Sequence, residues 1–348
     1  MRKTKPALSA SSFADRTNAS ILANPRLSGN VLLGRRSHEL IEAPHRKLNG
    51  NAHHAIADQL GRLNHPYKEL DIAFDSNSRS LWCYLKPEKR PSFTPSILRE
   101  LISLRGSIQG MFAQAGSDDA PPIKYFVGGS RVPGIYNLGG DFQLLLERIR
   151  AGDRAGLTRY AHDCIDVAYH MWTGFDVPII TIALVQGDAL GGGFEGALAF
   201  NVLVAERSAK FGLPEILFKL FPGMGAYSFL SRKLDSVRAE RMIMSGRIYT
   251  AEQLHEMGLV DVLADDGQGE AAVRDYIARH QRRHAVHSSI YQVRRRVNPL
   301  AFEELKDITE IWVETALHLA EPDLRKMERL MSAQTRRSAG SGAVGNTK

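Results

Sequence analysis

Two glutamates that follow glycine-containing segments are the residues of this sequence best suited to chemistry. Glu195 ends the stretch Val185-Gln-Gly-Asp-Ala-Leu-Gly-Gly-Gly-Phe-Glu195, and Glu215 ends Lys210-Phe-Gly-Leu-Pro-Glu215. Two carboxylates at one site can divide the general-base and general-acid roles if burial and mutual repulsion separate their pKa values. Taken singly, each glutamate is equally explained as a partner of a helix dipole, so the pairing depends on the fold.

Three consecutive glycines, at positions 191 to 193, lie between an apolar strand and the helix expected to follow it. A backbone without side chains can approach a ligand closely, and the free N–H groups of a first helical turn point outward. Such groups are suited to stabilising a developing oxyanion. On the glycines alone, however, a tight turn that lets the helix pack on the strand is the favoured interpretation.

The segments that must position these residues alternate between strand and helix patterns. Residues 70–74 and 81–85 predict a hairpin, 96–114 an amphipathic helix and 179–185 a strand that is apolar throughout, as in a sheet covered on both faces. The order of strand, turn, helix and strand indicates α/β architecture. Further strands are expected at 123–127 and 202–205, and further helices at 141–150, 157–173, 271–280, 300–320 and from Pro322 to 331.

The order of these motifs resembles the crotonase (enoyl-CoA hydratase/isomerase) superfamily. An apolar strand, Gly-x-Ala-Leu-Gly-Gly-Gly-x-Glu, a strand, Phe-Gly-x-Pro-Glu and Pro-Gly-x-Gly follow one another between residues 179 and 225, and the resemblance covers about 68–331. It implies a crotonase fold of stacked ββα units with a C-terminal helical region that packs between subunits, in trimers or hexamers. It also implies that Glu195 and Glu215 are catalytic. The oxyanion hole falls on Gly192 and Leu138, or on Gly139 because Gly139-Gly140 replaces the family's Gly-Ala.

Within the superfamily, the sequence is most similar to bacterial synthases of diffusible signal factors. The motifs that carry this similarity include Tyr136-Asn-Leu-Gly-Gly-Asp-Phe142, Phe221-Pro-Gly-Met-Gly-Ala-Tyr-Ser-Phe229 and Asp307-Ile-Thr-Glu-Ile-Trp-Val313. The resemblance implies dehydration of a 3-hydroxyacyl chain on acyl carrier protein and hydrolysis of the thioester to a free cis-2-unsaturated acid, a quorum-sensing signal. No Gly-x-Ser-x-Gly motif occurs, which disfavours an acyl-serine route. Trp312 is a candidate cover of the acyl pocket, and equally a core or subunit-contact residue.

Composition limits the class of protein. The 348 residues are 43% hydrophobic, and the net charge of +7 favours an acidic partner such as a carrier protein. The only cysteines, Cys83 and Cys164, predict no disulfide framework, and no apolar stretch approaches the ~20 residues of a membrane span. We therefore expect a cytoplasmic protein without membrane association. The expected regions are a flexible leader (1–60), a catalytic core (61–265), a helical oligomerisation region (266–331) and a disordered tail (332–348).

Other signals in the sequence are not assigned a function. Six arginines between 279 and 296 could contact nucleic acid or a carrier protein, but a solvated helix face is favoured and nucleic acid is not expected. The histidines lack metal-ligand spacing, and no phosphate-binding glycine loop is present, so neither metal nor cofactor is expected. Two alternatives remain open: a conventional enoyl-CoA hydratase or isomerase, and a binding protein that regulates a signalling partner such as a sensor kinase.

Overall fold

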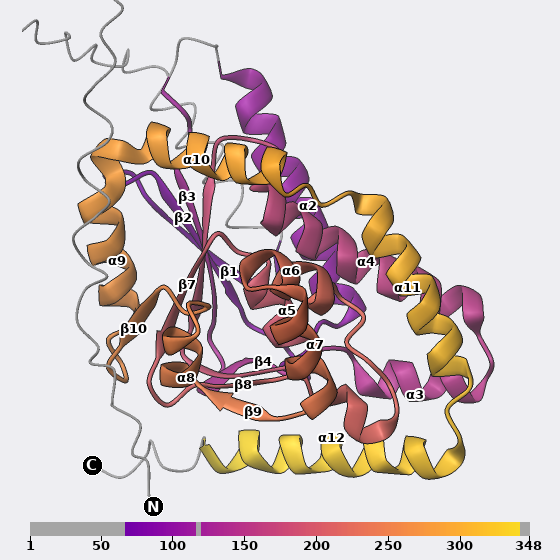
Figure 1. Ribbon diagram of the computed structural model, residues 1–348. Helices are drawn as coiled ribbons and strands as arrows, with labels where there is room; N and C mark the ends of the chain where they lie inside the picture. Colours follow the sequence, from indigo (N-terminus) through magenta and orange to yellow (C-terminus); the bar gives the residue numbers. More distant parts are fainter. Residues whose placement is uncertain (1–66, 116–119, 342–348) are drawn as a thin grey trace, which may run out of the picture. The chain divides into compact units, whose positions relative to one another are not determined.

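A six-stranded sheet lies at the centre of the computed structural model, which describes residues 67–115 and 120–341 (Figure 1). The strand order is β1-β2-β3-β5-β7-β10, and every neighbouring pair is parallel except the β1–β2 hairpin. The expected leader at 1–60 and residues 342–348 lie outside the described residues. The strands are β1 (Leu70–Asp75), β2 (Ser80–Leu85), β3 (Tyr125–Ser130), β5 (Ile180–Val185), β7 (Val202–Glu206) and β10 (Val262–Ala264).

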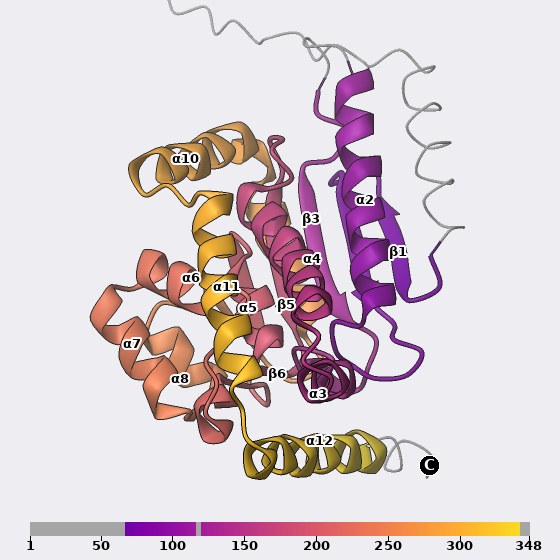
Figure 2. The same cartoon turned by 90° about the vertical axis from the view of Figure 1, so that its right-hand side faces the viewer.

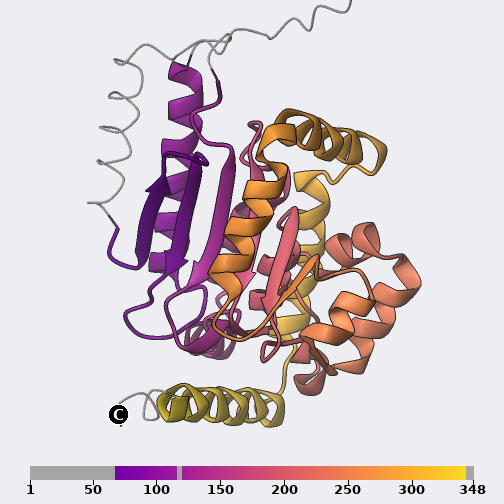
Figure 3. The ribbon, with the colours of Figure 1, turned by 90° about the vertical axis from the view of Figure 1, so that its left-hand side faces the viewer.

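Both faces of this sheet are covered by helices. Every residue of β5 is buried, and because alternate side chains of a strand point to opposite faces, Ile182 and Ala183 belong to different core clusters. The helix α9 (Gly269–His280) covers one face with Val273 and Ile277 (Figure 3). The helices α2 (Pro95–Gln114) and α4 (Arg154–Thr173) cover the other (Figure 2). The expected α/β architecture is confirmed.

Local sequence signals explain where the covering helices begin and end. Thr94 caps α2 by accepting a hydrogen bond from the Ile97 N–H, and Pro95 occupies the first turn, where its missing N–H has no cost. Asp153 caps α4, which ends at Gly174 in the left-handed conformation typical of helix C-termini. The helix α2 therefore begins one residue before its predicted start at 96, and α4 begins three residues before its predicted start at 157.

A second sheet of four short strands, which the sequence did not predict, runs in the order β4-β6-β8-β9. Each of β3, β5 and β7 in the main sheet is followed directly by a short strand of the second sheet, which confirms the stacked units implied by the resemblance. Strands of three or four residues are too short to show a clear period of two. They are β4 (Gly134–Asn137), β6 (Gly187–Leu190), β8 (Lys210–Gly212) and β9 (Ile248–Thr250).

The remaining elements surround the ends of the two sheets. The helix α11 packs on α4 and contacts α3, and α12 contacts α3 and η1. None of the helices within residues 67–115 and 120–341 is long and apolar enough to cross a membrane. These elements are α3 (Phe142–Arg150), α5 (Gly192–Leu198), η1 (Pro214–Phe218), α6 (Ala226–Lys233), α7 (Ser236–Ser245), α8 (Ala251–Glu256), η2 (Gln281–Arg283), α10 (His284–Val297), α11 (Phe302–Leu317) and α12 (Glu321–Ser341).

Two expected boundaries differ from the structure. The division at residue 266 does not separate two packing units, because α9 contributes Val273 and Ile277 to the core of the main sheet. The last helix continues to Ser341, although regular structure was expected to end at residue 331. The extension includes Ala333, Gln334, Arg336 and Arg337, which are residue types that favour helix.

Candidate active site

The turn between β6 and α5 brings the two glutamates into one pocket. Gly191 has a φ of +54°, and its N–H donates to the Gly212 carbonyl at 2.8 Å. A Cβ at this position would lie 2.6 Å from Oε1 of Glu215. Glycine is therefore required both for the backbone conformation and for the close approach of the Glu215 carboxyl group.

Glu195 lies in the first turn of α5 and is 1% exposed. Its Oε1 accepts hydrogen bonds from the N–H groups of Met224, at 2.7 Å, and Ala226, at 2.9 Å. Burial raises the pKa of Glu195 to about 7, and the two N–H donors oppose a larger rise because they stabilise the carboxylate. Glu195 can therefore be ionised near neutral pH although it is buried.

Glu215 lies in η1, and its carboxyl group lacks the support that Glu195 receives. Its Oε2 is buried without a hydrogen-bond partner among the described residues. Burial raises the pKa of Glu215 well above its ordinary value, and the nearby charge of Glu195 raises it further. Of the two carboxyl groups, Glu215 therefore holds a proton more tightly than Glu195, which is the difference that a base and an acid at one site require.

The pocket around the two carboxyl groups is mainly apolar. Trp312 reaches it from α11, with its indole ring 2.6 Å from the place where a Cβ of Gly223 would lie. Trp312 lines the pocket and is 7% exposed, and its role as a cover of an acyl chain stays a prediction. The remaining walls come from the loop before α3, from α3, α4 and η1, and from the loop after η1: Gly140, Phe142, Leu145, Tyr160, Ala161, Cys164, Phe218, Leu220 and Met224.

Of the three expected oxyanion-hole residues, only Gly192 lines this pocket. The N–H of Leu138 donates to the Pro91 carbonyl at 2.7 Å, and the N–H of Gly139 donates to Oδ1 of Asn137, also at 2.7 Å. In this structure both amides donate to groups of the neighbouring backbone and side chains, and the assignment of Leu138 or Gly139 as an oxyanion donor stays a prediction.

Gly139 and Gly140 have other places in the site. With φ of +90°, Gly139 would carry a Cβ 2.7 Å from the nitrogen of Gly192, so its Cα lies against the oxyanion turn. Gly140 lines the pocket, and its N–H donates no hydrogen bond within the described residues.

The sequence did not identify Met224 and Ala226, whose amides hold Glu195. Their signal was nevertheless present, because both lie in or next to the Pro-Gly-Met-Gly stretch at 222–225, in which small residues allow the backbone to approach a buried group. Almost any residue type can supply a backbone N–H donor, so only the folded turn shows which carboxylate these amides bind.

The unassigned signals of the sequence lie away from this pocket, except for Cys164. The described cysteines, Cys83 and Cys164, are buried and free, and burial raises the pKa of each thiol. Nowhere in residues 67–115 and 120–341 do three His, Cys, Asp or Glu side chains form a group that could hold a metal ion. The arginine segment is only partly a solvated face, because the Arg294 guanidinium lies 5.0 Å from the Trp172 ring centroid and 4.9 Å from that of Tyr291.

Comparison with known proteins agrees with the fold. Residues 129–319, more than half of the chain, match the model of the enoyl-CoA hydratase/isomerase family. The chain belongs to this family. It is 34% identical over 182 residues to 2,3-dehydroadipyl-CoA hydratase of Escherichia coli (strain K12), which covers 51% of this chain and 65% of that protein. The matched part is therefore just under two thirds of that relative's length.

Solved structures show the same fold at lower identity. Enoyl-CoA hydratase from Bacillus halodurans superposes with a TM-score of 0.60 at 21% identity, covering 75% of this chain and 98% of the other. DspI of Pseudomonas aeruginosa superposes with a TM-score of 0.53 at 22% identity, covering 68% of this chain and 91% of the other. At these identities the similarity establishes the fold.

Proposed function

We propose that the protein adds water to, or removes it from, the C2–C3 bond of an acyl thioester. The observation that carries this proposal is the geometry of the two glutamates: Glu195, held by two backbone amides, and Glu215, whose Oε2 has no partner among the described residues, face one pocket beside Gly192. Water addition to a 2-enoyl thioester needs one group that accepts a proton from water and another that donates one to C2. The pair supplies both when Glu195 is ionised and Glu215 is protonated.

The reaction can be written with this chain's groups alone. In hydration, the Glu195 carboxylate takes a proton from water while the water oxygen bonds to C3. The C2–C3 π electrons move toward the thioester carbonyl, whose oxygen becomes negative and accepts hydrogen bonds from the amides of Gly192 and Gly140. Glu215 then protonates C2. Dehydration reverses each step, so it begins with Glu215 ionised and Glu195 protonated.

The thioester carrier is proposed to be coenzyme A or acyl carrier protein. The family assignment supports an acyl-CoA, and the net charge of +7 suits either the phosphates of coenzyme A or an acidic carrier protein. The two carriers are distinguished by comparing turnover of the same acyl group on each.

A second candidate activity is the dehydration and hydrolysis that would release a free cis-2-unsaturated acid. It is supported by the ionised Glu195 beside the amide of Gly192, because a base and an oxyanion donor are what water needs to attack a thioester carbonyl. Cys164 also lines the pocket, but burial raises the pKa of its thiol, which disfavours an acyl-cysteine intermediate. Hydrolysis would therefore proceed through water.

One experiment tests the main proposal and separates it from the second. The full-length protein is incubated with 2-enoyl and 3-hydroxyacyl thioesters on both carriers, and all products are measured by mass spectrometry. Interconversion without free acid supports a hydratase, whereas accumulation of free cis-2 acid supports the dehydratase–thioesterase. Glu215→Gln should lower either activity by ~10² to 10⁴-fold. A wild-type protein that is folded but leaves every thioester unchanged would refute both.

The helical region after residue 266 is proposed to join copies of the chain into a trimer or hexamer, as the resemblance implies. The support is a row of apolar side chains on α10, spaced four, three and four residues apart, that are 57% to 79% exposed in the single chain. This spacing places them on one face of the helix, where a second copy could bury them. They are Val286, Ile290, Val293 and Val297.

A further inference from the structure

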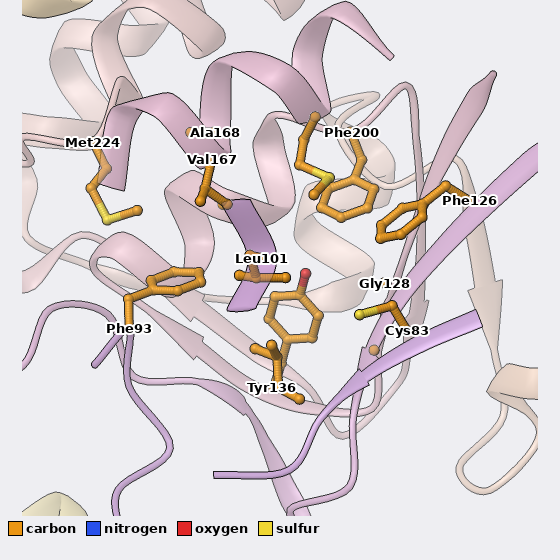
Figure 4. Close-up of a pocket in the computed structure, with 14 residues that line it drawn as sticks. Cys83, Phe93, Leu101, Phe126, Gly128, Tyr136, Val167, Ala168, Phe200 and Met224 are labelled. Atoms are coloured by element: carbon orange, nitrogen blue, oxygen red, sulfur yellow. The ribbon is translucent and has the colours of Figure 1, made fainter. Parts of the chain in front are cut away.

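A second cavity lies behind the candidate active site, between the main sheet and the helices α2 and α4 (Figure 4). Met224 lines both cavities, and its Sδ lies 2.5 Å from the place where a Cβ of Gly192 would be. The helix α5 likewise turns Glu195 toward the first cavity and Gly196 toward the second. Met224 therefore lies at the boundary between the two cavities, and its flexible thioether can adopt another rotamer.

Apolar side chains form most of the wall of this second cavity, with one polar exception. Figure 4 shows the Tyr136 ring projecting from β4 into the cavity, with its hydroxyl oxygen toward the middle. Tyr136 is 6% exposed, and its hydroxyl makes no hydrogen bond to any described residue. The other lining residues offer no side-chain nitrogen or oxygen: Cys83, Leu85, Phe93, Leu101, Phe126, Gly128, Gly129, Val167, Ala168, Met171, Gly196, Phe200 and Met224.

The Tyr136 hydroxyl faces the cavity (Figure 4), and a hydrogen bond from it to a ligand oxygen would contribute ~0.5 to 1.5 kcal/mol. The ligand must be neutral at this end, because no Lys, Arg or His lines the wall and a buried unpaired charge is far more costly. The cavity volume is about 40 Å³. One water molecule needs roughly 10 to 15 Å³ of such a volume, so the cavity holds roughly three heavy atoms of an acyl chain.

We propose that this cavity binds the far end of the acyl chain and that Tyr136 selects chains carrying a neutral hydroxyl or keto oxygen there. The inference rests on the proposed function, since it names the substrate class of that site. The chain runs from C3, beside Glu195, past Met224 and ends against Tyr136. Tyr136 acts in specificity and takes no part in the proton transfers.

The test compares pairs of 2-enoyl-CoA thioesters of equal chain length, with and without a hydroxyl or keto group near the chain end. Tyr136→Phe removes only the hydroxyl and should lower kcat/KM for the oxygenated member about tenfold while leaving the plain member unchanged. Tyr125→Phe is the matched control, because the Tyr125 hydroxyl has no hydrogen-bond partner among the described residues and belongs to the core cluster on the opposite face of the sheet. It should leave both members unchanged.

A second variant tests the path of the chain without depending on the hydroxyl. Ala168→Leu places a larger side chain in the cavity and should lower turnover of the longer thioesters, while crotonyl-CoA, whose chain ends before Met224, is turned over normally. Thermal melting confirms that the variant is folded. Equal preference of wild-type protein and Tyr136→Phe for the two members of each pair would refute the proposal, as would an unchanged chain-length profile in folded Ala168→Leu.

The outcome remains informative if the proposed function fails. In that case wild-type protein would not turn over crotonyl-CoA or any other thioester. Calorimetric titration with unreactive thioether analogues of the same pairs then measures the cavity alone. About tenfold tighter binding of the oxygenated analogue, lost in Tyr136→Phe and kept in Tyr125→Phe, supports the cavity assignment without catalysis. Equal binding of both analogues by wild-type protein would refute it.

Discussion

Replacing Glu195 by glutamine should make the protein less active and more stable at the same time. Glu195 has an ordinary pKa of 4.5 in the unfolded chain and about 7 in the folded protein, because it is buried. The folded state therefore binds this proton more tightly than the unfolded state. The free energy of unfolding of the wild-type protein should fall as the pH rises between these two values.

The size of this effect follows from the pKa difference. Below pH 4.5 Glu195 is protonated in both the folded and the unfolded state, so it does not change the free energy of unfolding. Between pH 4.5 and 7 the wild-type protein loses about 1.4 kcal/mol of stability for each pH unit, and above pH 7 the loss is constant at about 3 kcal/mol. Glutamine does not titrate, and its oxygen can still accept from the amides of Met224 and Ala226. Glu195→Gln should thus be up to about 3 kcal/mol more stable at pH 8 and equal to wild type near pH 4.

The assay is urea unfolding of both proteins across this pH range, together with the rate of thioester hydration, which should fall by ~10² to 10⁴-fold. Glu206→Gln is the control, because Glu206 is also buried but accepts from Gln186 and the Gly269 N–H away from the pocket. It should retain hydration and gain no stability. A Glu195→Gln protein that is no more stable than wild type at pH 8, or whose advantage persists at pH 4, would refute the account of Glu195.

Three further predictions follow from the site and the helical region. Gly192→Val should displace the Met224 thioether and block the oxyanion position, lowering hydration and any thioester hydrolysis together by about a hundredfold or more; full hydrolysis with lost hydration would show that the two reactions use different oxyanion sites. Gly191→Ala should lower the rate and the Tm, because its Cβ would lie 2.6 Å from Glu215 in a backbone conformation that disfavours alanine; unchanged kinetics would contradict the close contact. Replacing Ile290 and Val293 by Asp should reduce the mass in light scattering to that of one chain, and an unchanged mass would exclude α10 from the subunit contact.

The sequence was informative where side-chain types repeat with the period of an element. Trp312 at the pocket and Glu195 in the first turn of α5 were predicted from such patterns and from the family resemblance. The short strands β8 and β9 were missed, because three residues show no period. The hydrogen bond from the Leu138 N–H to the Pro91 carbonyl was not foreseen for a related reason: the direction of a backbone N–H in a loop depends on nearby acceptors, which residue types do not reveal.

The position of Trp312 also affects how the protein is made. The pocket that holds Glu195 and Glu215 is closed by an indole ring from α11, which leaves the ribosome long after both glutamates. Until α11 is synthesised, the nascent chain lacks one wall of its binding pocket, and Leu305, Val313 and Ala316 have not yet covered the apolar surface beneath them. A chain released after α10 should therefore expose this surface to chaperones and proteases, and completion of α11 coincides with completion of the pocket.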